Sequence, residues 1–165
     1  MSGKRRRPDD NRPPLEAGIE RVRRHGDAVE LVVRLRNRHP DRVLHYISEV
    51  RGVAVDAGRV VVRLTDQGRT VIPGAVGRLP AFGRIDPDST ARLALRLPAT
   101  IVRMRTPATP TTEVELDERP VDPAAEFEVV IGWSDTPYYP DPRAGQGPSG
   151  RTGDWEQGQI RARQT

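Results

Sequence analysis

Histidine spacing offers the first candidate for chemistry. The segment HPDRVLH places His39 and His45 on either side of Asp41, and imidazole and carboxylate groups are ordinary zinc ligands. Two histidines six positions apart share one face of a strand only if the segment is fully extended, and Pro40 works against that. No third ligand follows from the spacing. We therefore expect no metal site and no cofactor.

Nucleophiles and paired carboxylates give a similarly weak signal. Neither Ser89 nor Ser134 lies in a Gly-x-Ser-x-Gly or Ser-x-x-Lys motif, and the chain has no cysteine. Asp86 and Asp88 could hold calcium weakly, but the EF-hand spacing is absent. A turn that caps backbone groups explains both carboxylates better. We expect no catalytic residues and a protein that is not an enzyme.

Charge is concentrated at the ends of the chain. Residues 1–14 carry five basic and two acidic side chains, and residues 141–165 carry four and three. The stretch between them holds 18 of each, so its net charge is zero. The basic run KRRRP at 4–8 could contact phosphates, but a folded nucleic-acid reader should carry its basic face on the domain itself. Nucleic-acid binding is therefore not expected.

Aromatic residues cluster near the C-terminus. Four of the seven lie in the stretch FEVVIGWSDTPYY, at positions 127–139. Phe127 and Trp133 share one parity with Val129 and Ile131, so a strand here would turn all four toward one apolar face. We expect Phe127 and Trp133 to belong to the core.

Tyr138 and Tyr139 differ from the other aromatic residues of this stretch. They lie between Pro137 and Pro140, in an extended segment that lacks a full set of backbone donors. Two interpretations stay open. The tyrosines either cap the end of the domain or contact a ligand or partner.

These residues must be positioned by strands. Apolar and charged residues alternate at 28–37 and 89–98, which predicts strands with one buried face. Apolar runs at 43–55 and 59–66 flank the turn 56–59 and predict a hairpin. A short helical turn near 15–23 is the one helical candidate. Further strands are expected at 19–24, 79–85, 113–117 and 126–133, and the strand 89–98 is expected to continue into 101–105 beyond Pro98.

Seven or eight short strands in one chain of 165 residues indicate an antiparallel β-sandwich. In pattern, the chain resembles bacterial immunoglobulin-like domains. The resemblance rests on LVVRLRN ending at Asn37, on IDPDSTARLALRLP, and on the final strand EFEVVIGW. It implies an immunoglobulin-like sandwich and carries no catalytic residues. We expect the domain to span 15–142.

Both ends of the chain are expected to be disordered. Residues 1–14 are basic and interrupted by proline, and residues 143–165 are rich in Gly, Ser and Gln. The 143–165 segment contains Trp155 and Ile160 as isolated apolar residues. We expect this tail to dock on a partner through them, and its removal to leave the melting temperature nearly unchanged.

Function is only broadly bounded by these features. We expect no secretory or membrane-spanning segment, because the basic residues near the start meet no apolar run and no stretch approaches 18 apolar residues. The arginine-rich, lysine-poor composition is typical of a high-GC bacterial genome. We expect a non-catalytic protein-interaction or accessory module of a bacterial cytoplasmic assembly. Its expected partner contacts are Tyr138, Tyr139, Trp155 and Ile160. The alternative is a module that binds a small ligand or carbohydrate through the tyrosines. The oligomeric state stays open.

Overall fold

The computed structural model describes residues 12–65, 80–105, 115–137 and 155–164. These residues form eleven β-strands and no helical element, more strands than the seven or eight expected. In chain order they are β1 (Leu15–His25), β2 (Ala28–Asn37), β3 (Leu44–Ile47), β4 (Gly52–Asp56), β5 (Arg59–Leu64), β6 (Phe82–Ile85), β7 (Thr90–Pro98), β8 (Thr100–Arg105), β9 (Glu115–Pro120), β10 (Glu126–Ser134) and β11 (Gly158–Arg163).

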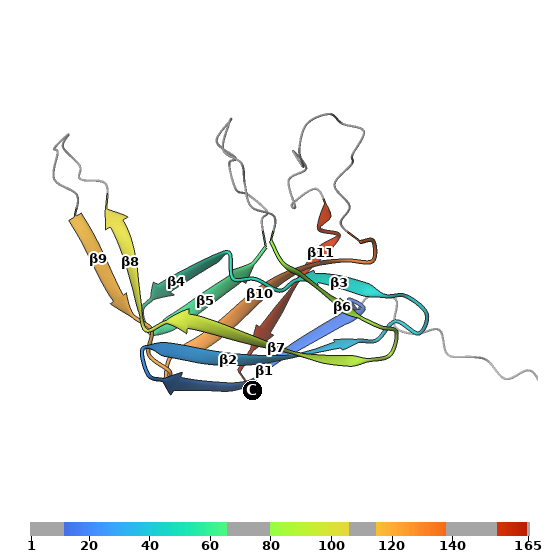
Figure 1. The fold of residues 1–165 in the computed structure, drawn as a ribbon, viewed down its shortest axis with the longest axis horizontal. Helices are drawn as coiled ribbons and strands as arrows, with labels where there is room; N and C mark the ends of the chain where they lie inside the picture. The colour runs from blue at the N-terminus through green and yellow to red at the C-terminus, as the bar shows by residue number, and fades with distance from the viewer. Residues whose placement is uncertain (1–11, 66–79, 106–114, 138–154, 165) are drawn as a thin grey trace, which may run out of the picture.

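The strands form two facing sheets and a small ribbon (Figure 1). Sheet A has the order β1-β2-β7. Sheet B has the order β4-β5-β10-β3-β6, and β11 also pairs with β10. All neighbours are antiparallel except β5 and β10, which run parallel. The prediction of an all-β sandwich is confirmed.

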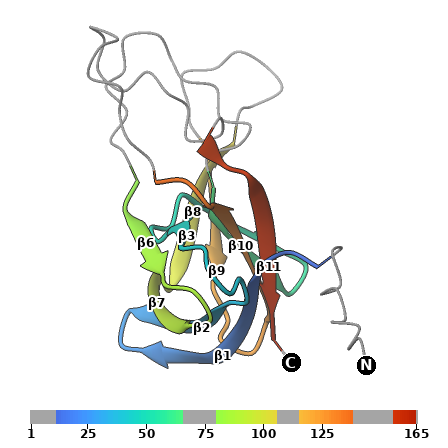
Figure 2. The ribbon, with the colours of Figure 1, turned by 90° about the vertical axis from the view of Figure 1, so that its right-hand side faces the viewer.

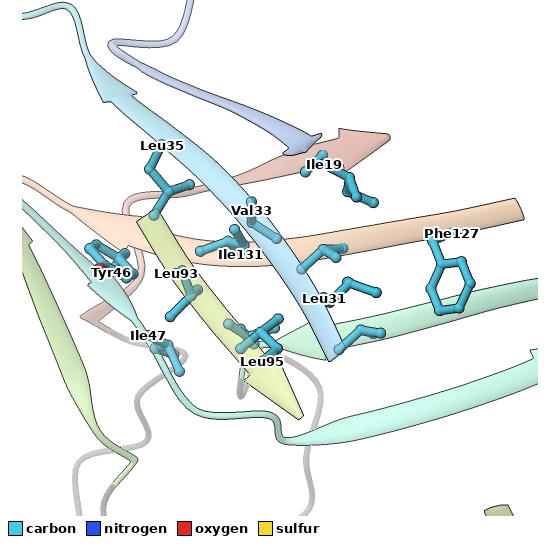
Figure 3. Packing of buried hydrophobic residues seen from close by; sticks show 14 of the residues in the cluster. Ile19, Leu31, Val33, Leu35, Tyr46, Ile47, Leu93, Leu95, Phe127 and Ile131 are labelled. Carbon is cyan, nitrogen blue, oxygen red and sulfur yellow. The ribbon is translucent and has the colours of Figure 1, made fainter. Parts of the chain in front are cut away.

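The core lies between the two sheets (Figure 3). Alternation along β2 turns every second side chain inward, and the same holds along β7. Side chains of β2 and β7 thus face those of β3 and β10 across the sandwich. The buried members on these strands include Val29, Leu31, Val33, Leu35, Leu93, Leu95, Leu97, Leu44, Phe127, Val129 and Ile131.

Strand β10 is buried on both faces. Phe127 and Trp133 point into the core with 0% and 7% of their surface exposed, so the prediction for them is confirmed. The opposite face of β10 carries Glu128 and Ser134, and both are buried as well. Since β10 has paired strands on both edges, long side chains from β5 and β11 cover this outer face.

The predicted turn at 56–59 is confirmed, and a second tight turn joins β1 to β2. The two-residue loop between β4 and β5 is Ala57-Gly58, and both residues have positive φ, at 42° and 79°. That is the type I′ geometry, which suits the right-handed twist of a hairpin. Gly26 has φ 61° at the first loop position between β1 and β2, where a glycine is also favoured. Both hairpins are therefore set by local sequence.

A buried amide closes the end of β2. Asn37 is fully buried, and its Nδ2 lies 2.7 to 3.2 Å from the carbonyl oxygens of Arg42, Ile85 and Asp86. Its Oδ1 accepts the His39 N–H at 2.9 Å. One side chain thus connects the end of β2 to the loop before β3 and to the end of β6. The sequence marks Asn37 only as the residue where the strand ends.

The helical turn expected near 15–23 is wrong. The whole segment belongs to β1, which pairs with β2 from Leu15↔Asn37 to His25↔Ala28. A register shift between Ile19 and Arg21 breaks the strict alternation of apolar residues. That bulge is the physical reason why the period-two pattern is weak in the sequence.

Three further expectations are corrected. The apolar run at 43–55 is divided between β3 and β4 instead of forming one strand. The segment 101–105 leaves sheet A and pairs with β9 as β8. The last strand is β11, not 126–133, so the prediction of a flexible tail over 143–165 is wrong for its residues 155–164.

The β8–β9 ribbon extends away from the sandwich (Figure 1). Met104 and Leu116 are paired across it and are 78% and 61% exposed. Val102 lies two residues from Met104, on the same face, and is 54% exposed. These three are the large apolar side chains most exposed to solvent among the described residues.

Candidate functional site

The four residues predicted as partner contacts fall into two groups. Tyr138 and Tyr139 lie outside the described residues, so their role as ligand or partner contacts stays a prediction. Trp155 and Ile160 belong to the folded domain.

Trp155 packs against sheet B. Its ring meets the Phe82 ring edge-on, with centroids 4.9 Å apart and an interplanar angle of 76°. Its Nε1–H donates to the Thr136 carbonyl at 2.7 Å. An aromatic contact and a satisfied indole donor are typical of a residue with a structural role. Trp155 therefore joins the chain before β11 to β6 and to the segment that follows β10.

Ile160 lies in the middle of β11. Its register partner on β10 is Ile131, which is fully buried in the core. Paired residues of neighbouring strands point to the same face of a sheet, so Ile160 points toward the interior of the sandwich. It is only half-buried, because the two sheets separate beside it.

The edges of the two sheets lie side by side at β1 and β11 (Figure 2), and a hollow opens beside β1. A parallel bridge joins Ile19 of β1 to Gln164, the residue after β11. Counting back equally on both strands places Leu15 level with Ile160. The hollow has a volume of about 640 Å³ and is bordered by residues 15–20 of β1 and by Ile160. We call it the β1 groove.

The edge of β1 that borders the groove carries backbone N–H and C=O groups that do not bond to β2. The Arg38 N–H donates to the Pro14 carbonyl at 2.8 Å. Pro14 and Arg38 are therefore a hydrogen-bonded pair, and the next pair along the ladder, Leu15 and Asn37, is a non-bonded pair. In an antiparallel ladder, bonded and non-bonded pairs alternate. Leu15 and Ala17 consequently turn their N–H and C=O groups away from β2, toward the groove. Among the described residues, no strand pairs with this edge before the bridge at Ile19.

The rim of the groove is cationic. Gly18 faces Arg34 across the β1–β2 ladder, and Arg12, Arg34 and Arg36 all border the hollow. A Cβ at Gly18 would have no atom within 4 Å. The space above Gly18 is therefore open, and the long Arg34 side chain can reach across β1 toward the edge.

A buried carboxylate holds β11 in place on the outer face of sheet B. Glu128 accepts from Arg59 at 2.6 Å, and from Arg161 and Arg163 at 3.1 Å each. Burial alone would raise the pKa of Glu128, but the hydrogen bonds and charges of these arginines outweigh it and hold that pKa below its ordinary value. The cluster joins β5, β10 and β11.

A second buried carboxylate lies where β11 begins. The Glu156 carboxylate lies above Gly132, where any side chain would overlap it. It accepts from the Thr65 hydroxyl, and Gln159 Nε2 lies 3.4 Å away. Sequence reasoning missed both carboxylates as structural residues. The sequence offers one signal for β11 itself, a period-two alternation of Gly158, Ile160 and Ala162. It is too short to predict a strand.

The remaining candidate residues shape turns and loops, apart from His45, which lies on β3. Among the described residues, no group of three or more His, Cys, Asp or Glu side chains could hold a metal ion. His39 Nδ1 accepts from the Arg42 N–H at 3.2 Å, and burial lowers the pKa of His45. The Ser134 hydroxyl lies 2.9 Å from the Thr136 hydroxyl, where it stabilises the turn after β10.

No helix in the described part of the chain is long and apolar enough to cross a membrane. Comparison of the chain with protein-family models, with curated proteins and with solved structures finds no match.

Proposed function

We propose that this protein is a non-catalytic interaction module of a bacterial cytoplasmic assembly, which binds an extended segment of a partner protein along the β1 groove. The segment would add to the edge of β1 as a further strand. In this mode of recognition, backbone hydrogen bonds supply affinity, and alternate side chains supply specificity.

The observation that carries the proposal is the open edge at Leu15 and Ala17, which faces a hollow of about 640 Å³. An unpaired edge is a template for pairing with another strand. The floor beside it is formed by the half-buried apolar side chains of Ile160 and Ala17. Every second side chain of an added strand would pack on this floor.

We also propose an immunoglobulin-like arrangement for the sandwich. In that fold, the first, second and fifth strands share one sheet, while the third, sixth and seventh share the other. The neighbour relations β1-β2-β7 and β3-β10-β11 support the assignment. The parallel pairing of β5 with β10 and the β8–β9 ribbon would be additions to it.

A matched pair of proline variants tests strand addition. Ala17→Pro removes the N–H that faces the groove without removing a bond to β2, so the fold should tolerate it. Ala94→Pro is the control, because Ala94 lies on β7, at the other edge of sheet A, where its N–H also faces away from β2.

The ligands are selected from a display library of random peptides with the wild-type protein. We expect the selected peptides to slow amide hydrogen exchange at Leu15 and Ala17, to bind Ala94→Pro normally, and to lose binding to Ala17→Pro. Selected peptides that bind Ala17→Pro equally well, or that protect another surface, would overturn the proposal. A selection without any binder to the folded protein would do the same.

A further inference from the structure

We infer that the segment bound in the β1 groove is acidic, with carboxylates at every second position and apolar side chains between them. The inference rests on the proposed function and names the class of partner. It follows from the charges that border the groove and from the alternation of side chains along a strand.

Arg34 and Arg36, at the rim, form at most a weak ion pair with the described residues. Within the described part of the chain, no carboxylate lies within 4 Å of the Arg34 guanidinium. Among the described residues, the one carboxylate within 4 Å of the Arg36 guanidinium is that of Asp88, at 3.8 Å and with a side chain that is 76% exposed. An ion pair of this kind contributes little. Arg34 and Arg36 can therefore bind an incoming carboxylate.

The carboxylates at the rim are already engaged. Glu16 accepts from Arg38 at 2.7 Å, and Glu20 accepts from Arg92 at 2.9 Å. Each of these acids is matched by an arginine that does not border the groove. The potential at the groove is consequently set by Arg12, Arg34 and Arg36, and it favours anionic side chains.

Gly18 leaves a path between the edge of β1 and the Arg34 side chain. A strand added to β1 lies two strand spacings from β2, about 10 Å away. A side chain at position 18 would stand between them on the outer face. Because Gly18 has none, an outward-facing carboxylate on the added strand can meet Arg34, while its neighbours on the strand turn inward to Ile160.

Charge also distinguishes between the candidate occupants. In a second copy paired through β1, Arg34 and Arg36 of each copy would face those of the other, and like charges repel. Residues 1–11 of the chain itself carry four basic and two acidic side chains, so they match the rim poorly. A partner segment with a negative charge fits the groove best.

Three labelled peptides of about eight residues, the length of an ordinary strand, test the charge class. Valine alternates with glutamate in the first, with serine in the second and with lysine in the third. We expect the glutamate peptide to bind the wild-type protein at least about tenfold more tightly than the serine peptide. The difference in affinity between the glutamate and serine peptides should shrink as salt rises from about 50 to 500 mM, because salt screens exposed charges.

Arg34→Glu reverses the charge above Gly18. We expect this variant to lose about tenfold or more in affinity for the glutamate peptide and to bind the lysine peptide better than the wild type does. Arg103→Glu, an exposed arginine on the β8–β9 ribbon, is the control and should leave all three affinities unchanged. Thermal melting establishes that both variants are folded.

The possible outcomes separate the two proposals. If the serine and glutamate peptides bind equally and both depend on Ala17, strand addition stands and the acidic preference is wrong. If Arg34→Glu changes nothing while Ala17→Pro abolishes binding, the assignment to Arg34 fails in the same way. If no peptide binds and no amide of β1 is protected, both proposals are wrong.

Discussion

The hydroxyl of Thr65 lies 2.5 Å and 2.6 Å from the two carboxylate oxygens of Glu156, although 91 positions separate these residues in the sequence. The contact connects the residue after β5 to the segment just before β11. Both side chains are buried, so the hydrogen bonds form out of water. This pair positions the strand that supplies Ile160 to the β1 groove.

Removing the Thr65–Glu156 contact should destabilise the protein. We expect Thr65→Val, which keeps the shape and removes the hydroxyl, to lower the free energy of unfolding by about 1–3 kcal/mol, because a buried carboxylate loses a donor. Urea denaturation measures the change. Thr90→Val, at an exposed position at the start of β7, is the control. An unchanged midpoint for Thr65→Val would show that the contact is dispensable.

Acid should weaken the Glu128 cluster. The folded state lowers the pKa of Glu128, so this carboxylate stabilises the protein above its ordinary pKa, and the contribution disappears as pH falls through the lowered value. We expect Glu128→Gln to cost about 2–3 kcal/mol at pH 7 and to lose less stability than the wild type below about pH 5.

Denaturant midpoints measured from pH 7 to pH 3 check the Glu128 prediction. Glu126→Gln is the matched control, since Glu126 lies on the same strand and face but is exposed. If the midpoints of Glu128→Gln and of the wild type fall in parallel, Glu128 is not responsible for the acid loss.

Deleting residues 155–165 should lower the melting temperature, contrary to the expectation from the sequence alone. The deletion removes β11, exposes an edge of β10 and leaves Glu128 without two of its arginines. We expect a fall of about 10 °C or more in circular-dichroism melting. Deleting residues 1–11 is the comparison and should have little effect. Equal melting temperatures for both truncations would contradict the position of β11.

The turn between β4 and β5 can be improved. Ala57 adopts φ 42°, a left-handed conformation that costs an alanine about 1–2 kcal/mol. Ala57→Asn would create the Asn-Gly pair that type I′ turns favour, and we expect about 0.5–1 kcal/mol of added stability in urea denaturation. Gly58→Ala, at φ 79°, should have the opposite effect. A loss of stability in Ala57→Asn would contradict the turn geometry.

Sequence reasoning succeeded where one face of a strand is buried. Strands β2 and β7 alternate between buried apolar residues and outward residues, most of them charged or small, because their outer faces meet water. It failed where tertiary partners replace that pattern. Strand β11 has few apolar residues, since its outer side chains serve the Glu128 cluster and the buried Glu156 instead of the core.

The groove could not be predicted for the same reason. Its borders come from β1 and β11, whose bridge joins Ile19 to Gln164, and the sequence shows no relation between these residues. The sequence indicates Ile160 as a partner contact only because it is an isolated apolar residue in a polar segment. Alternation at 28–37 places Arg34 and Arg36 together on the solvent face of a strand, but the sequence does not show that Arg12 and the edge of β1 lie beside them.

The position of β10 has a consequence for how the chain folds. β10 pairs with β5, which precedes it by more than sixty residues, and with β11, which follows it after a long interval. Such distant pairings are slow to form because the chain between them must first be brought together. A nascent chain can build the β1–β2 and β4–β5 hairpins early. Sheet B is complete, and Glu128 fully paired, only after Arg163 has been synthesised.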